Sequence, residues 1–179
     1  MTSAAEYLAQ IEAQLGASWL PRIYLEQILK MRTRAYEFPR LPKETSPEIS
    51  HTLLGIELKA GRRRMLCPDL PTARYLAVFA RAGCKAVAIP YDITLIAHAA
   101  DELETSWHRM VLLLDSVAAG RSKAFRTRLR RLLIGKVRDE ITDAGCGPRM
   151  PEFKQSAKET DKQQRGAGST KQSNGRRAR

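Results

Sequence analysis

The sequence has few of the residues that mark metal-binding or disulfide-bonded proteins. It contains three cysteines and three histidines among 179 residues, and no two cysteines stand in a C-x-x-C arrangement. The cysteines, Cys67, Cys84 and Cys146, are far apart and odd in number. This argues against a zinc ribbon, a redox pair or a disulfide framework. We interpret Cys67 and Cys84 as core thiols.

Targeting and membrane segments are also missing from the pattern. No apolar run approaches about 18 residues, so no transmembrane helix is predicted. The first residues lack the basic-then-apolar order of a secretory signal. We therefore expect a soluble, reduced protein that is cytoplasmic, nucleoid-associated or nuclear and is not secreted.

Acidic residues are scarce in the C-terminal third of the chain. Residues 1–120 hold 14 Lys and Arg against 13 Asp and Glu, whereas residues 121–179 hold 17 against 6. The formal net charge of +12 therefore comes almost entirely from the second segment. This concentration of positive charge predicts a polyanionic partner: nucleic acid first, an acidic membrane surface second and an acidic protein third. A ribosome-associated factor fits the charge equally well.

Apolar periodicity predicts an α/β protein, in which a small sheet with a crossover helix is flanked by further helices. We divide it into a helical region (1–37), a Pro-rich linker (38–51), an α/β core (52–120), a basic amphipathic helix (121–144) and a disordered basic tail (145–179). Helices are predicted over 3–15, from 19 or 21 to 36, over 69–82, from 94 to about 119, and over 121–141.

The α/β core begins with an extended run that carries two charges. Leu53, Leu54 and Leu58 make this run look buried, yet Glu57 and Lys59 interrupt it. Residues two apart on a strand share a face, about 7 Å from each other. A carboxylate there can hold a divalent cation, and an ammonium can orient water or neutralise a phosphate. The alternative is an exposed edge strand with an ordinary cross-strand charge pattern.

The run GIELKAGRRRMLCPDLPTARYLAVFARAGCKAVAI resembles the core of the PD-(D/E)XK nuclease superfamily, and most of all its virus-type replication-repair and Holliday-junction-resolvase-like members. The resemblance covers residues 52–94. It implies a restriction-endonuclease-like core and a Mg²⁺-dependent nuclease, in which Glu57 binds the metal, Lys59 is catalytic and Thr72 or Arg74 faces the site.

That family also carries an acid, usually Asp, on the strand before E-x-K. Residues 33–56 contain no Asp, while Glu44 and Glu48 are nearby. We assign Glu48 as the second catalytic carboxylate and metal ligand. The dipeptide Pro68-Asp69 follows the E-x-K strand, and we interpret Asp69 as a helix cap.

The predicted helix 121–141 carries cations with no acid before Asp139. A solvated face would mix charges of both signs. Phe125 is the one aromatic on its apolar side, so the pattern favours phosphate contacts with DNA or RNA over base stacking. The predicted nucleic-acid-binding residues are Arg121, Lys123, Arg126, Arg128, Arg130, Arg131, Lys136 and Arg138 on this helix, with Arg62, Arg63, Arg64 and Arg74 in the core.

Two functions from different classes follow. The first is a nucleic-acid-processing nuclease with Mg²⁺ as its cofactor. The second is a non-catalytic DNA- or RNA-binding or complex-assembly protein without a cofactor, whose apolar helices contact a protein partner or a second copy. The competing interpretations are a solvated turn for Arg62–Arg64 and an acidic lipid surface for the basic helix. His98 with Glu102, and Glu104 with His108, stand four residues apart, a spacing that can hold a metal. Neither pair has the H-E-x-x-H order, so we predict surface ion pairs.

Overall fold

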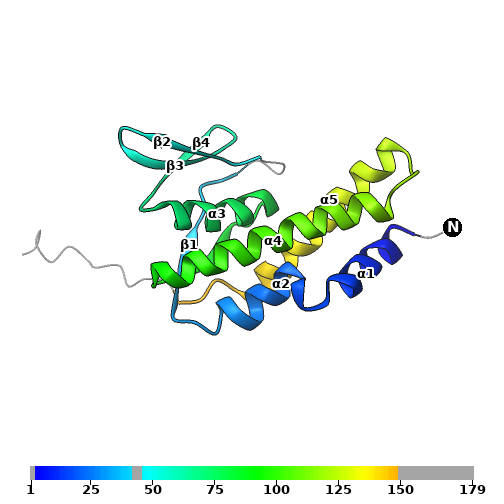
Figure 1. Ribbon diagram of the computed structural model, residues 1–179, viewed down its shortest axis with the longest axis horizontal. Helices are drawn as coiled ribbons and strands as arrows, with labels where there is room; N and C mark the ends of the chain where they lie inside the picture. Colours follow the sequence, from blue (N-terminus) through cyan, green and yellow to red (C-terminus); the bar gives the residue numbers. More distant parts are fainter. Residues whose placement is uncertain (1–2, 42–45, 149–179) are drawn as a thin grey trace, which may run out of the picture. The chain divides into compact units, whose positions relative to one another are not determined.

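The computed structural model describes residues 3–41 and 46–148, which form a mixture of helices and small antiparallel sheets (Figure 1). The helices are α1 (Ala4–Leu15), the 3-10 helix η1 (Gly16–Ser18), α2 (Leu20–Ile23), the π-helix η2 (Tyr24–Ile28), α3 (Leu70–Ala82), α4 (Ile93–Val117) and α5 (Lys123–Ala144). The strands are β1 (Thr33–Glu37), β2 (Glu48–Thr52), β3 (Gly55–Ala60), β4 (Arg63–Cys67) and β5 (Ala86–Pro90).

Helices α1 and α3 begin at the caps that the sequence predicts. Ser3 accepts the backbone N–H of Glu6, and the Glu6 carboxylate accepts the N–H of Ser3 in return, which makes a capping box. Asp69 accepts the N–H of Thr72 at 2.7 Å. Gly83 ends α3 with φ of 73°, a left-handed conformation that glycine adopts without strain. Both predicted helices are confirmed.

The two long helices α4 and α5 are confirmed as well. Asp92 caps α4 by accepting the N–H of Thr94, and Ser122 caps α5 by accepting the N–H of Phe125. The apolar stripe of α4 packs against α3. Its most buried members are Ala99, Ala100, Leu103, Met110 and Leu114.

The predicted helix that reaches residue 36 is wrong in its second half. Helix α2 passes into η2, which ends at Ile28, and the chain then forms β1. Strand β1 pairs antiparallel with β5, from Thr33 opposite Pro90 to Glu37 opposite Ala86. The partner strand lies some 50 residues away in the sequence, and such pairing overrides local helical spacing.

The strands form two separate antiparallel sheets, so the predicted small sheet with a crossover helix is wrong. One sheet is β1–β5 and the other is the meander β2–β3–β4. Helix α3 leaves β4 in one sheet and leads to β5 in the other, and no parallel strand pair occurs in the described ranges. A strand–helix–strand hydrophobic pattern does not record whether its two strands pair with each other.

The first predicted core strand is shorter than expected. Leu53 and Leu54 form the turn between β2 and β3, and they are 107% and 79% exposed. Gly55 follows with φ of 122°. The predicted basic loop turns at Gly61, and from Arg63 onward it is strand β4.

The predicted linker 38–51 contributes to the fold at both ends. Phe38 is buried and donates its backbone N–H to the carbonyl of Lys85 at 2.8 Å. Residues from Glu48 onward form β2, which pairs with β3. Helix α3 contacts this meander on one side and α4 on another (Figure 1).

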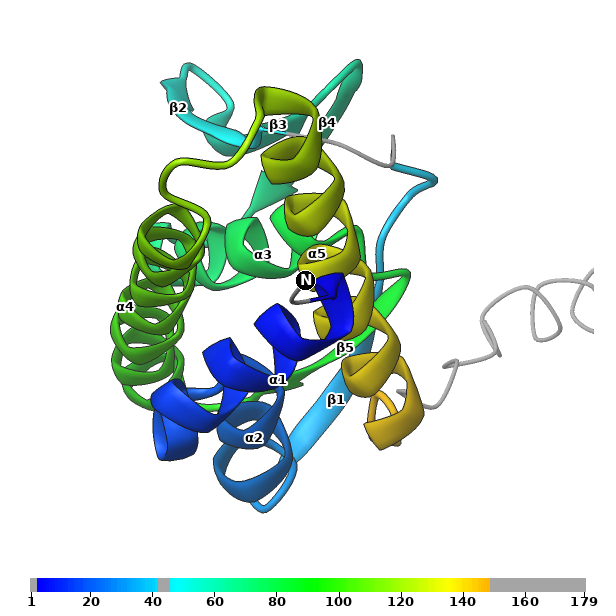
Figure 2. The same ribbon diagram turned by 90° about the vertical axis from the view of Figure 1, so that its right-hand side faces the viewer.

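Helix α5 is part of the hydrophobic core. It contacts α1, α3 and α4 and lies beside β5 (Figure 2). The chain after α5 also packs on the fold, because the carbonyl of Pro148 accepts the backbone N–H of Ala35 at 2.9 Å. The predicted tail therefore begins too early at residue 145, and its remainder, 149–179, lies outside the described residues. The α5 side chains that reach the core are Leu129, Leu133, Val137 and Ile141, each 0–1% exposed.

Candidate nucleic-acid interface

The orientation of α5 is set by its apolar side chains, which repeat every four residues. With Leu129 and Leu133 fully buried, the positions between them face outward. The first half of the helix therefore presents its cations to solvent. Four of these cations are exposed and form no ion pair in the described part of the chain: Lys123, Arg126, Arg128 and Arg130.

Three of these cations form a row that we call the basic stripe: Lys123, Arg126 and Arg130. Positions i, i+3 and i+7 lie on one side of a helix. At about 1.5 Å of rise per residue, the stripe is about 10 Å long. Arg128 is exposed on a neighbouring side of the same helix, and Arg131 is exposed as well.

The remaining predicted cations of this helix already have partners. Lys136 contacts Glu12 at 2.9 Å and Glu140 at 3.3 Å. Hydrogen bonding to Glu12 is the main cause that raises the pKa of Lys136. Arg138 contacts Asp139 at 3.3 Å. Lys136 therefore joins α5 to α1, whereas Arg138 pairs within α5, and both cations are less available to a ligand.

Arg121, just before α5, is held by two aromatic rings. Its guanidinium donates to the hydroxyl of Tyr7 at 2.9 Å and 3.2 Å. It also lies 5.8 Å from the ring centre of Tyr7 and 5.9 Å from that of Phe125. Phe125 is thus engaged within the protein, and no aromatic side chain of α5 faces solvent for base stacking.

Arg74 joins two helices. From α3, its guanidinium donates to Glu104 at 2.6 Å and to Asp101 at 2.7 Å, both on α4. These hydrogen bonds, the one to Glu104 first, raise the pKa of Arg74. Charge-assisted bonds of this length hold the side chain in place, so a phosphate would have to displace two carboxylates. Thr72, the other candidate on α3, is buried.

The nuclease candidates share the outer face of the meander. The register sets Glu48 opposite Lys59 and Ser50 opposite Glu57, so both acids and the lysine lie on one face. Lys59 contacts Glu48 at 3.5 Å, and Arg64 contacts Glu57 at 3.7 Å. The predicted cross-strand charge pattern is therefore present, although β3 is the central strand and not an edge.

These residues, as placed, do not fit a Mg²⁺ ion. Such ions are usually held by one or two carboxylates together with substrate phosphates. Here Glu48 and Glu57 each face a cation of the protein, so the metal would have to break both ion pairs. Throughout residues 3–41 and 46–148, no group of three or more His, Cys, Asp or Glu side chains is placed to hold a metal.

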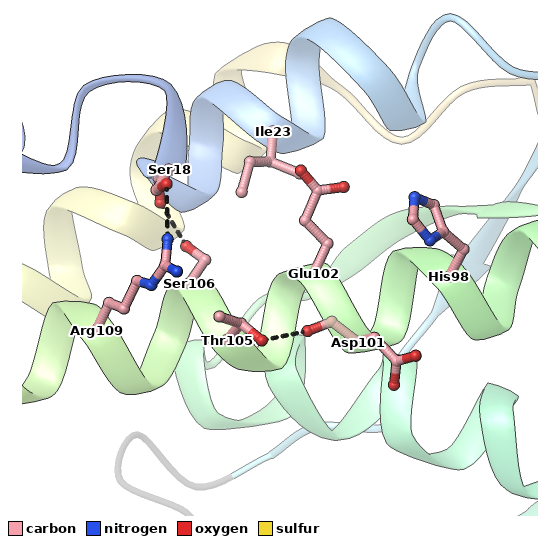
Figure 3. Close-up of a pocket in the computed structure, with 8 residues that line it drawn as sticks. All are labelled: Ser18, Ile23, His98, Asp101, Glu102, Thr105, Ser106 and Arg109. Carbon is pink, nitrogen blue, oxygen red and sulfur yellow. Dashed lines mark hydrogen bonds between the residues drawn. The ribbon is translucent and has the colours of Figure 1, made fainter.

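A shallow cavity of about 350 Å³ lies between α4 and the η1–α2 segment (Figure 3). Several of its polar groups are bonded to the protein: Arg109 donates to Ser18 at 3.3 Å, and Ser106 donates to the Ser18 carbonyl at 2.7 Å. Glu102 accepts from Gln27 outside the cavity. The lining is Ser18, Ile23, His98, Asp101, Glu102, Thr105, Ser106 and Arg109.

The ion pairs predicted along α4 are wrong. His98 does not pair with Glu102, whose partner is Gln27, and His108 does not pair with Glu104, whose partner is Arg74. Both carboxylates instead reach toward a neighbouring helix. The predicted core thiols are confirmed, because Cys67 and Cys84 are buried, and burial raises the pKa of Cys84 to about 12.

Comparison with family models, curated proteins and solved structures finds no match. No helix in the described residues is long and apolar enough to span a membrane.

Two features of the surface could not be predicted from the sequence. The first is strand β4, because three arginines in a row give no strand signal. The second is the exposure of Leu53, Leu54 and Leu66, since leucines in an extended run are read as core. Gly55 was a signal for the turn, because glycine is common in and beside tight hairpin turns.

Proposed function

We propose that this protein binds nucleic acid through the phosphate backbone, using the basic stripe on α5. The observation that carries the proposal is the division of cations along the helix. Lys123, Arg126 and Arg130 are exposed and have no ion pair within the described residues, whereas Lys136 and Arg138 are paired. Adjacent unpaired cations repel each other unless a polyanion neutralises them.

The dimensions of the stripe fit a single strand of phosphates. Successive phosphates advance by about 3.4 Å along the axis of each strand in B-form DNA. A stripe about 10 Å long therefore spans about three of them. This supports contacts to consecutive phosphates of one strand.

The chemistry of the stripe supports binding that does not depend on sequence. Phosphate contacts position a nucleic acid but carry no base information. The aromatic ring nearest the stripe, Phe125, packs against Tyr7 at 5.6 Å between ring centres and is not free to stack on a base. We therefore propose DNA or RNA as the partner, in the cytoplasm, nucleoid or nucleus.

An acidic lipid surface fits α5 less well. An interfacial helix inserts its apolar face into the bilayer. The apolar face of α5 is occupied, because Leu129, Leu133 and Val137 are buried among the other helices. A membrane would meet charge alone, without the apolar contribution that stabilises such binding.

The proposal is tested by fluorescence anisotropy of the full chain with labelled duplex DNA and single-stranded RNA. The stripe variant combines Lys123→Ala, Arg126→Ala and Arg130→Ala. Its affinity should fall by at least about tenfold at low salt, because three phosphate contacts are lost. A control variant removes the same charge from exposed positions elsewhere that form no ion pair with any described residue: Arg22→Ala, Lys30→Ala and Lys85→Ala. It should keep wild-type affinity. Equal losses in both variants would sink the proposed site.

A metal-dependent nuclease is a second candidate, in which a bound metal would displace Lys59 from Glu48 and Arg64 from Glu57. The observation that favours it is the placement of Glu48, Glu57 and Lys59 on one face of the meander. It is tested by incubating labelled DNA and RNA with the protein, Mg²⁺ or Mn²⁺, and a chelator control. Cleavage that Glu57→Gln and Lys59→Ala both abolish would establish it. Intact substrates in every lane would leave these residues as a structural charge pattern.

A further inference from the structure

The meander has an open edge at β4 (Figure 1). Strand β4 pairs with β3 on one side alone. In an antiparallel ladder, every second residue of an edge strand turns its N–H and C=O away from the neighbouring strand. Within residues 3–41 and 46–148, no backbone hydrogen bond from another element reaches this edge. It therefore presents a template on which a further strand can pair.

Three consecutive arginines lie where β4 begins. Arg62 and Arg63 are exposed and form no ion pair in the described part of the chain. Arg64 contacts Glu57 at 3.7 Å, and its side chain is 69% exposed. The contact is made by Nη1 of Arg64 and a Glu57 side chain that is 15% exposed. The other N–H groups of the exposed guanidinium can donate to a second carboxylate.

The opposite end of the same edge is apolar. Leu66 is 64% exposed and lies beside Gly55, where a Cβ would be 3.5 Å from its Cδ1 atom. The turn just before Gly55 adds Leu53 and Leu54, both exposed. Neighbouring exposed leucines are typical of an interaction surface. The edge is thus basic at one end and apolar at the other.

We propose that β4 binds an extended acidic segment of a partner protein by strand addition. The segment pairs antiparallel with β4 and so continues the meander. In this register its apolar residues lie opposite Leu66, and carboxylates follow two and four residues later, opposite Arg64 and near Arg62. The backbone ladder provides affinity, and alternate side chains provide specificity.

A peptide uses more of this surface than the other occupants do. A phosphate backbone would contact the arginines but would leave Leu66 and the free backbone groups of β4 unused. Antiparallel pairing of β4 with a second copy, centred on Met65, would set Arg64 opposite Leu66 and give neither a complementary partner. The combination of a free ladder, carboxylate receptors and an apolar end favours the acidic segment.

The test is fluorescence anisotropy with the full chain and a labelled peptide, Thr-Val-Thr-Val-Thr-Glu-Thr-Glu-Thr. Three control peptides separate its features: one with Lys in place of Glu, one with the order reversed, and one with alternate amides N-methylated to remove the ladder donors. We expect the first peptide to bind at least about tenfold tighter than each control, because like charges or lost backbone bonds oppose the others.

A charge exchange on the protein supplies the matching test. The variant Arg62→Glu with Arg64→Glu should lose the Glu peptide and gain the Lys peptide. The variant Arg22→Glu with Lys85→Glu has the same charge change at exposed positions elsewhere, and it should retain the original preference. All four positions are exposed, and far-UV circular dichroism verifies that the variants are folded.

Three results would overturn the proposal. Equal binding of the N-methylated peptide would exclude strand addition, and tighter binding of the reversed peptide would exclude the antiparallel register. Absence of binding by every peptide would exclude the site, and a loss of nucleic-acid affinity in the Arg62/Arg64 variant would then make the arginines a phosphate site. The basic stripe on α5 is intact in this variant, so failure here leaves the proposed function standing.

Discussion

The hydroxyl of Tyr24 accepts the backbone N–H of Ala88 at 2.8 Å. Ala88 is fully buried in β5, and the hydroxyl of Tyr75 donates to its carbonyl at 2.5 Å. Two tyrosines thus satisfy both backbone groups of Ala88, which would otherwise be buried without partners. Tyr24 also donates to the carbonyl of Gly145 at 2.7 Å. One side chain of η2 therefore joins β5 to the segment that follows α5.

Replacing Tyr24 by Phe should destabilise the protein. The variant removes the partner of the Ala88 N–H and of the Gly145 carbonyl, and we expect a loss of about 2–4 kcal/mol in the free energy of unfolding. Urea denaturation followed by circular dichroism measures it. Tyr91→Phe, at a half-exposed residue, is the control and should change stability by less than about 0.5 kcal/mol. Equal stability of the two variants would contradict the network.

The same tyrosine should make stability depend on alkaline pH. Burial raises the pKa of Tyr24 to about 12, while an unfolded chain ionises its tyrosines near about 10. The contribution of Tyr24 to the free energy of unfolding is complete below the pKa of the unfolded chain. It falls by about 1.4 kcal/mol per pH unit between the unfolded and folded pKa values. Urea denaturation at several values of pH should show that the free energy of unfolding falls less steeply with rising pH in Tyr24→Phe than in wild type. The pKa of Tyr75 is also raised, so part of the loss remains. Identical profiles would refute this role.

Gly147 should resist substitution although it is exposed. Its φ is 75°, and a Cβ there would lie 3.0 Å from the Thr33 hydroxyl oxygen. We expect Gly147→Ala to lower the free energy of unfolding by about 1–2 kcal/mol. Gly135→Ala, within α5, should instead raise it by about 0.5–1 kcal/mol. No loss at Gly147 would show that the positive φ and the close approach to Thr33 do not constrain this position.

Arg74 should matter for stability and not for nucleic-acid binding. Its guanidinium holds Glu104 and Asp101 across the α3–α4 contact. We expect Arg74→Met to reduce the free energy of unfolding by about 0.5–2 kcal/mol, because the pair is only partly exposed. Affinity for duplex DNA should stay within about twofold of wild type. A larger loss of affinity at unchanged stability would place Arg74 in the interface.

Helices α1, α3, α4 and α5 could be predicted from the sequence because their signals are local. Helix α3 begins after Asp69 and ends before Gly83, and both residues hydrogen-bond to backbone groups close in sequence. Ser122 caps α5 by accepting a backbone N–H in the same way as Asp69. Strand β1 and the separation into two sheets could not be predicted, since they depend on partners distant in the sequence.

The candidate site divides in the same manner. The row of cations on α5 is visible in the sequence. The sequence does not show which cations form ion pairs, because Lys136 pairs with Glu12 on α1 and Arg74 pairs with Glu104 on α4. Ion pairing between elements needs the packed fold, and it separates predicted cations held within the protein, such as Lys136 and Arg74, from exposed cations such as those of the basic stripe.

The most direct test of the central claim is the salt dependence of duplex DNA binding, compared between wild type and the Lys123/Arg126/Arg130 stripe variant. Cations elsewhere in the chain contribute equally to both proteins, so the difference isolates the stripe. The slope of log affinity against log salt should be smaller in magnitude by about 2.7 in the variant, since each phosphate contact contributes about 0.9. The Arg22/Lys30/Lys85 control should keep the wild-type slope. Identical slopes for wild type and the stripe variant would show that α5 does not contact the phosphate backbone.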